Sequence, residues 1–96
     1  MLNKEQILEI IRENRATLKQ FGVKRLALFG SYASNQATSS SDLDFLVEFQ
    51  EKSFDAYMGL KDFLEGLFHC QVDLVLPNTI KPRLKPQILR DLVDAA

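Results

Sequence analysis

Apolar residues recur at helical spacing in three stretches of the chain, and each stretch predicts an amphipathic helix. The first helix is expected to begin after Asn3, because Asn3 and Gln6 have the spacing of a capping box, and to end near Gly22. The second is expected over residues 54–67, and the last is expected to start at Pro86, since proline suits the first helical position. The apolar positions that define these helices are Ile7, Leu8, Ile11, Leu18 and Phe21, then Phe54, Met58, Leu60, Phe63, Leu64 and Leu67, then Ile88, Leu89, Leu92 and Val93.

Three other stretches predict β-strands. Residues 23–29 form a run of mostly apolar side chains that is typical of a buried strand. Residues 42–49 alternate between polar and apolar side chains, so Asp42 and Asp44 are expected to point to the same face of a sheet. Residues 71–76 alternate in the same way, and Asp73 is therefore expected to face away from the core.

The order of these elements predicts a small mixed β-sheet and an α+β (α/β) fold. The first two strands are expected to be antiparallel, because Gly30-Ser31 at the end of one must meet Asp42 at the start of the next. The helix between the second and third strands favours a parallel, right-handed connection. Helices are expected on one face of the sheet, and the other face is expected to be open and acidic. Residues 1–96 suit one domain with one core.

Composition narrows the class of protein. No apolar run approaches the length of a membrane span and the N-terminus lacks an apolar signal core, so a cytoplasmic protein is expected. The single cysteine, Cys70, excludes an intramolecular disulfide. The net charge of −1 conceals an acidic segment, because residues 42–73 hold eight acidic and two basic residues. Most of these are expected on a solvated surface, but Asp42, Asp44 and Asp73 stand among apolar strand residues.

These three aspartates have the chemistry of a metal site. Magnesium prefers carboxylate and phosphate oxygens, and two aspartates at strand positions i and i+2 with a third on a neighbouring strand form a suitable ligand set. Asp42, Asp44 and Asp73 meet that requirement. A turn or helix-cap role would suit Asp42 if it stood alone after three serines. Together, the three predict a site for divalent cations.

Gly30-Ser31 predicts a phosphate-binding turn close to these carboxylates. Glycine lets the backbone approach a phosphate, and Ser31 adds a hydroxyl and an N–H group near an expected helical turn, where the dipole favours anions. An EF-hand calcium loop is excluded, because Leu46 and Val47 occupy positions that need a ligand and a glycine. A Walker phosphate loop is also absent from the sequence. Transfer of a nucleotidyl group needs both a phosphate cradle and charge neutralisation.

The chain resembles the minimal nucleotidyltransferases (MNT) of the DNA polymerase beta superfamily. The resemblance rests on Leu28-Phe29-Gly30-Ser31-Tyr32-Ala33, Ser41-Asp42-Leu43-Asp44 and Val72-Asp73-Leu74, and it covers nearly the whole chain. It implies a polymerase-beta-like nucleotidyltransferase palm with little beyond it. It also implies an antitoxin that moves AMP from ATP to a tyrosine of a HEPN toxin, often a ribonuclease.

The same resemblance implies roles for the site residues. Gly30 and Ser31 would hold the triphosphate of ATP, and Asp42 and Asp44 would bind two magnesium or manganese ions. Asp73 would complete one metal site and assist deprotonation of the acceptor hydroxyl.

The sequence departs from the family pattern after the Tyr-Ala pair. The family often has Arg-Gly there and another basic residue a few positions later, whereas this chain has Ser34-Asn35 and Thr38. Loss of a cation at these positions would weaken triphosphate binding or activity but would leave the carboxylates in place.

A second interpretation therefore stays open, in which the chain is a non-catalytic antitoxin that occludes its partner by binding. Nucleotide transfer to a small molecule and nucleic acid polymerisation are disfavoured, because no residues are left for an acceptor-binding domain. Four basic residues in the C-terminal segment are expected to form a solvated face or to contact a partner protein, a nucleotide phosphate or RNA. They are Lys81, Arg83, Lys85 and Arg90. The base preference, the acceptor residue and the choice between monomer and homo-oligomer are not readable from the sequence.

Overall fold

The structure is a computed structural model that describes residues 2–51 and 53–96. In chain order its elements are α1 (Lys4–Glu13), α2 (Arg15–Gln20), β1 (Val23–Phe29), β2 (Leu43–Phe49), α3 (Phe54–Phe68), β3 (Val72–Val75), the 3-10 helix η1 (Pro77–Thr79), α4 (Lys85–Arg90) and β4 (Val93–Asp94). Within the described ranges, no helix combines the length and the apolar composition needed to cross a membrane.

The strands form a mixed sheet in the order β3-β2-β1-β4. β1 and β2 are antiparallel, and β2 and β3 are parallel, as the sequence predicted. The antiparallel pairing places Phe29 opposite Asp44. The parallel pairing places Asp44 opposite Asp73. The end of β1 and two of the predicted aspartates therefore meet in one part of the sheet.

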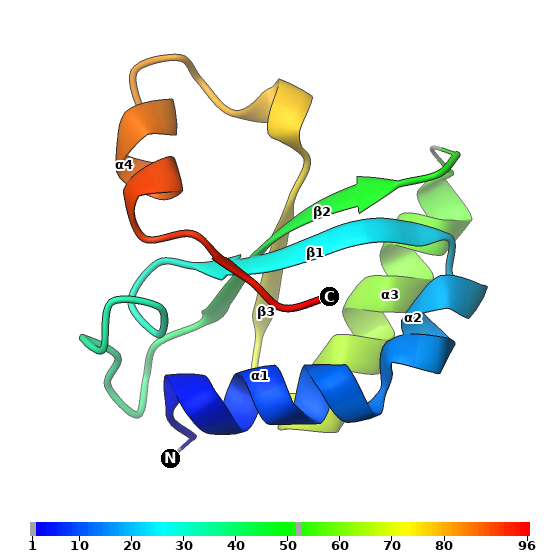
Figure 1. Cartoon of the computed structure of the whole chain (residues 1–96), viewed down its shortest axis with the longest axis horizontal. Helices are drawn as coiled ribbons and strands as arrows, with labels where there is room; N and C mark the ends of the chain where they lie inside the picture. The colour runs from blue at the N-terminus through cyan, green and yellow to red at the C-terminus, as the bar shows by residue number, and fades with distance from the viewer. Residues whose placement is uncertain (1, 52) are drawn as a thin grey trace.

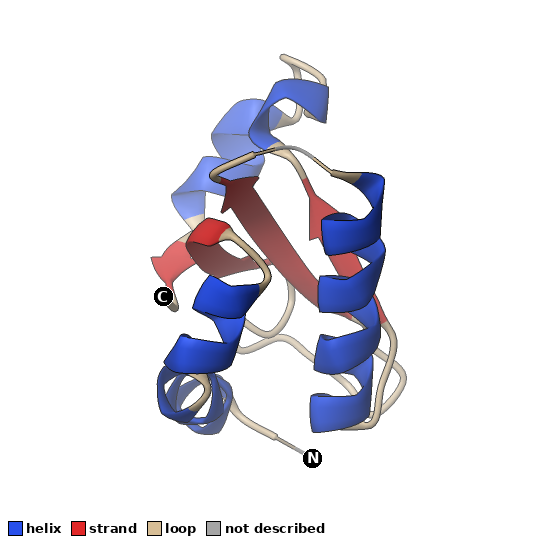
Figure 2. Ribbon diagram, turned by 90° about the vertical axis from the view of Figure 1, so that its right-hand side faces the viewer, coloured by secondary structure: helices blue, strands red, loops and turns tan. Residues whose placement is uncertain are grey.

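Three helices cover one face of this sheet. Figure 1 shows α1, α2 and α3 grouped together, and Figure 2 shows their packing beside the strands. The main core lies between them, and its fully buried side chains with the largest volumes include Phe45, Ile7, Ile11, Leu18, Leu26, Leu28, Leu43, Leu60 and Leu64. These are mostly the apolar positions from which the helices and strands were predicted, so the hydrophobic pattern determines this layer.

The N-terminal helix is interrupted, whereas one continuous helix was predicted. The capping box is present, since the Gln6 N–H donates to Asn3 Oδ1 at 2.8 Å and the Asn3 N–H donates to Gln6 Oε1 at 3.0 Å. The break comes at Asn14, whose side-chain amide donates to the Ile10 carbonyl oxygen at 2.8 Å. An asparagine that hydrogen-bonds its own backbone competes with helix continuation, which explains the break.

The second face of the sheet is partly covered, so the expectation of an open face was wrong for that part. Ala27, Phe29 and Leu46 are buried there, and the partly buried side chains that pack against them are Val75, Ile80, Ile88 and Leu92. Figure 1 shows α4 on the opposite side of the strands from α1 and α3. Leu46 is only 4% exposed, although the alternation of β2 places it on the polar face. Asp44 and Asp73 lie near the starts of β2 and β3, at one end of the sheet.

The last helix is shorter than predicted, and the chain beyond it forms a strand. Val93 was predicted in the helix but pairs with Leu28 in β4. The Ala95 N–H donates to the Leu26 carbonyl oxygen at 2.8 Å, and the Leu26 N–H donates to the Ala96 carbonyl oxygen at 2.9 Å. This pairing satisfies backbone groups on the edge of β1, which would otherwise have no strand partner.

Candidate active site

Asp44 and Asp73 form the centre of the site. They lie in register on the parallel strands β2 and β3, and Asp44 is half-buried while Asp73 is exposed. Burial, the charge of Asp73 and a hydrogen bond with Asp73 together raise the pKa of Asp44 from 3.8 to about 6, and burial contributes most. Two carboxyl groups held this close favour a shared proton or a bound cation between them.

Asp42 lies next to this pair but outside the strand. β2 begins at Leu43, whose N–H donates to the Gln71 carbonyl oxygen at 3.0 Å, so Asp42 lies just outside the strand and is exposed. Its charge makes the smallest contribution to the raised pKa of Asp44. Among residues 2–51 and 53–96, no group of three acidic, histidine or cysteine side chains is close enough to hold a metal ion. The structure therefore assembles two of the three predicted carboxylates.

Gly30 lies directly against Asp44. Its φ of +78° is in the left-handed region, which favours glycine. A Cβ atom at Gly30 would overlap Asp44 Oδ2 and would lie 3.1 Å from Asp44 Cγ. Glycine is therefore required at this position by both the backbone and the neighbouring carboxylate.

Ser31 begins a hydrogen-bonded turn. The Gln36 N–H donates to the Ser31 carbonyl oxygen at 2.8 Å, and the Ser34 N–H donates to the Gly30 carbonyl oxygen at 3.1 Å. Residues 31–35 form turns and no helix, so the predicted contribution of a helix dipole at Ser31 has no support in the structure. The turn keeps Ser31 at the end of β1, directly after the glycine that contacts Asp44.

A hollow of about 460 Å³ extends from the two carboxylates toward the η1–α4 segment. Side chains that line it include Phe29, Asp44, Tyr57, Lys61, Asp73 and Lys81. Sequence reasoning did not single out Lys61, and it assigned Lys81 to a basic C-terminal face. The available signal for Lys61 was its position as one of the two basic residues within the acidic segment 42–73. The two lysines place cationic groups in the same hollow as the carboxylates.

Tyr57 fixes α3 to the strand that carries Asp73. Its hydroxyl group donates to the Leu74 carbonyl oxygen at 2.6 Å. A second contact joins the same elements farther along, where the Val72 N–H donates to Glu65 Oε2 at 3.0 Å. Since the two bonds bracket Asp73 in β3, the position of its backbone is set by α3 as well as by β2.

Comparison with known proteins assigns this chain to a family. The family model described as a nucleotidyltransferase domain matches residues 4–95. The chain belongs to the nucleotidyltransferase domain family. This nucleotidyltransferase is 42% identical over 91 residues to a Methanocaldococcus jannaschii protein assigned provisionally as a protein adenylyltransferase, with 92% of this chain and 93% of the relative covered. It is also 36% identical over 95 residues to the protein adenylyltransferase MntA of Thermococcus cleftensis, with 97% and 96% covered.

Solved structures agree with this assignment. A provisionally assigned minimal nucleotidyltransferase matches with a TM-score of 0.80 and 33% identity, over 96% of this chain and 95% of that chain. The nucleotidyltransferase also matches a chain from a toxin–antitoxin complex with a TM-score of 0.62 and 26% identity, over 98% and 72% of the two chains. A third match, at 19% identity and a TM-score of 0.64, comes from a complex of an MNT antitoxin with a tri-AMPylated HEPN toxin of Shewanella oneidensis, with 93% and 71% covered. At that identity the likeness supports the fold alone.

Proposed function

We propose that this nucleotidyltransferase transfers AMP from ATP to a hydroxyl group, a tyrosine, of a HEPN toxin and thereby acts as an antitoxin. The observation that carries the proposal is the Asp44–Asp73 carboxyl pair, held in register next to Gly30 and facing a hollow of about 460 Å³. The relatives named as protein adenylyltransferases support the reaction class, since they cover almost the whole chain.

In the proposed reaction, the oxygen of the acceptor hydroxyl forms a bond to the α-phosphorus of ATP. The bond from that phosphorus to the bridging oxygen of the β-phosphate breaks, and pyrophosphate leaves with the electron pair. The proton of the hydroxyl passes to a carboxylate of the site or to water. Asp73 is the exposed member of the carboxyl pair, so it is the member that an acceptor protein can approach.

The carboxyl pair has the donor chemistry that the family's magnesium ions require. Its oxygens are hard ligands, and the pKa of Asp44 is raised first by burial and then by the charge of Asp73, two costs of ionisation that a bound dication offsets. Asp44 and Asp73 would hold the metal, and the exposed carboxylate of Asp42 and the phosphate oxygens of ATP would supply further ligands. When bound, magnesium or manganese neutralises the charge that develops on the phosphates.

Gly30 and Ser31 would bind the phosphates of ATP. Because Gly30 has no Cβ, its backbone can lie against both a phosphate and Asp44. The family's basic residues are absent after Tyr32-Ala33, and the cations nearest to the carboxyl pair in the hollow are instead Lys61 and Lys81.

The HEPN partner is proposed from two lines of support. One is the match at 26% identity to a chain of a toxin–antitoxin complex. The other is the resemblance of the motifs to MNT antitoxins, whose acceptor is a protein. ATP and magnesium are both abundant in the cytoplasm, which is the proposed place of action. The proposed unit is the single domain 1–96, acting on a protein and not on nucleic acid or at a membrane.

The deciding experiment measures the intact mass of the HEPN protein after incubation with this chain, ATP and magnesium. We expect the mass to rise by one or more AMP groups, and the separated HEPN protein to stay inactive. Asp44→Asn and Asp73→Asn should each lower the rate of transfer by orders of magnitude while the fold persists, since each keeps the side-chain size. Asp62→Asn, on the exposed side of α3, is the matched control and should leave the rate unchanged.

The same experiment tests the alternative of an antitoxin that inhibits by binding alone. An unchanged mass, with inhibition that disappears on separation and persists with Asp44→Asn, would favour that alternative and contradict AMP transfer.

A further inference from the structure

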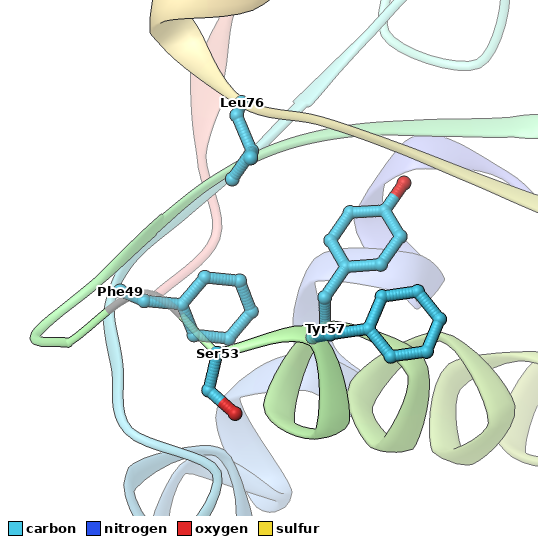
Figure 3. Close-up of a pocket in the computed structure, with 5 residues that line it drawn as sticks. Phe49, Ser53, Tyr57 and Leu76 are labelled. Carbon is cyan, nitrogen blue, oxygen red and sulfur yellow. The ribbon is translucent and has the colours of Figure 1, made fainter.

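A second hollow lies beyond the carboxyl pair, between the end of β2 and the start of α3. Its volume is about 390 Å³, and Phe49, Ser53, Phe54, Tyr57 and Leu76 line it. We name these five residues the aromatic groove. Figure 3 shows Phe49 and Tyr57 on opposite sides of the groove, with Leu76 reaching over it from the segment after β3.

Phe54 makes the groove unusual for a surface. It is 77% exposed, whereas Phe45 and Phe68 are buried in the main core. A single exposed apolar side chain is ordinary, but an exposed phenylalanine at the edge of an apolar hollow lined by two further aromatic rings forms a contiguous apolar patch. Such a patch is typical of a surface that binds another molecule.

The groove and the carboxylate hollow meet at Tyr57. This residue lines both of them. Its hydroxyl group is bonded to the Leu74 carbonyl oxygen, one residue from Asp73. The wall of the groove is therefore held at a fixed position relative to Asp73, and a molecule bound in the groove is positioned relative to the carboxyl pair.

Along β2, the groove lies at the end of the strand that is far from Gly30. Asp44 is next to Gly30 near the start of β2, and Phe49 is the last residue of that strand. Five extended residues span on the order of 16 Å. In an in-line displacement, the attacking oxygen and the leaving oxygen are on opposite sides of the phosphorus. If the leaving pyrophosphate is at Gly30-Ser31, the acceptor hydroxyl approaches from the side of Asp73, and Tyr57 connects that side to the aromatic groove.

We propose that the aromatic groove binds the segment of the acceptor protein that carries the modified hydroxyl, through an apolar side chain of that segment. This inference rests on the proposed function and adds the surface that selects the acceptor. Acidic residues next to the groove indicate which charge the bound segment carries. Glu51 and Asp55 are exposed there, and neither forms an ion pair with another of the described residues. A segment with an apolar anchor and a neighbouring lysine or arginine is complementary to this surface.

The test is a truncation at Phe54, measured with the purified HEPN protein as acceptor. Phe54→Ala removes an exposed side chain, so the fold should persist. We expect the KM for the HEPN protein in AMP transfer to rise about tenfold or more, because an aromatic anchor in an interface contributes strongly to affinity. The affinity for ATP with magnesium should be unchanged. Leu89→Ala is the matched control, since Leu89 is 47% exposed on α4 and does not line the groove.

Three results would overturn the assignment. If Phe54→Ala is active and its KM for the HEPN protein is unchanged, the acceptor binds elsewhere. A weaker affinity for ATP with an unchanged KM for the HEPN protein would assign the groove to the adenine ring. A change of oligomeric state in Phe54→Ala, measured by light scattering with the KM unchanged, would assign it to a second copy of the chain. Failure of the proposed function is distinct, because the wild-type chain itself would then add no AMP to the HEPN protein.

Discussion

Gly30 and Asp44 are in such close contact that a side chain at position 30 would displace the Asp44 carboxylate. A Cβ there would overlap the Asp44 carboxylate, and the φ of +78° is unfavourable for any residue with a side chain. We expect Gly30→Ala to lower the free energy of unfolding by about 1–2 kcal/mol or more and to reduce AMP transfer strongly, because Asp44 must move. Urea denaturation and the intact-mass assay measure the two effects.

Two other glycines serve as controls that separate backbone strain at Gly30 from its contact with Asp44. Gly22 also has a positive φ, +81°, but a Cβ there would meet no atom within 4 Å. The Gly22→Ala variant should therefore be less stable only because of its positive φ, and it should keep its AMP-transfer activity. Gly66 is helical and has free space around it, so Gly66→Ala should stabilise the protein by up to about 1 kcal/mol. Equal losses of activity in Gly22→Ala and Gly30→Ala would contradict the role of the Asp44 contact.

The raised pKa of Asp44 predicts how stability depends on pH when divalent cations are removed. Its pKa is about 6 in the fold against an ordinary value of 3.8, so the folded state holds this proton more tightly than the unfolded chain does. The stabilisation from this group is complete below about pH 4 and is lost as the pH rises through 6. We expect wild type to lose stability relative to Asp44→Asn over that interval, measured by urea denaturation in the presence of a chelator.

Magnesium provides the check on this prediction. Above pH 6, adding magnesium should stabilise wild type more than Asp44→Asn, because a cation bound to the pair relieves the same repulsion. Asp62→Asn serves as the control for removal of an exposed charge. Parallel stability curves for wild type and Asp44→Asn across this pH interval would show that Asp44 is not perturbed as the structure indicates.

Much of the fold could be predicted because side-chain periodicity is a local property. The alternation of β2 correctly placed Leu43 and Phe45 in the main core and Asp44 on the other face. The antiparallel pairing of β1 and β2 also followed from chemistry, because Gly30-Ser31 had to meet Asp42 at the start of the next strand. The carboxyl pair was predictable for the same reason: it needs two strand positions and one parallel register.

The features that the sequence did not predict depend on contacts between distant segments. The pairing of Val93 with Leu28 arises because the edge of β1 lacks another strand, which no local pattern in the C-terminal segment reveals. The position of Asp42 outside β2 depends on where that strand begins, and strand ends are set by neighbouring hydrogen bonds. The place of Lys61 in the carboxylate hollow depends on the packing of α3 against β3.

The short strand β4 should contribute measurably to stability. Ala95→Pro removes the N–H that donates to the Leu26 carbonyl oxygen at 2.8 Å, and that oxygen keeps the Ala96 N–H at 3.0 Å as its donor. We expect the free energy of unfolding to fall by about 1 kcal/mol, the net value of one hydrogen bond. Asp94→Ala is the comparison, because its bond to Arg25 at 2.8 Å joins two partly exposed side chains and should matter much less. A Tm for Ala95→Pro equal to that of wild type would show that β4 is only loosely attached.

Lys61 and Lys81 should strengthen the binding of ATP. Both line the hollow that contains Asp44 and Asp73, where negative charge alone would repel a triphosphate. We expect Lys61→Met and Lys81→Met each to raise the Kd for a non-hydrolysable ATP analogue with magnesium several-fold, and the double variant to bind with a weaker dependence on salt. Lys85→Met is the matched control, since Lys85 is exposed on α4 and does not line the hollow. Titration calorimetry at two salt concentrations measures these effects. A Kd for the double variant equal to that of Lys85→Met would mean that neither lysine contacts the nucleotide, and the triphosphate would then depend on the Gly30-Ser31 turn and the metal alone.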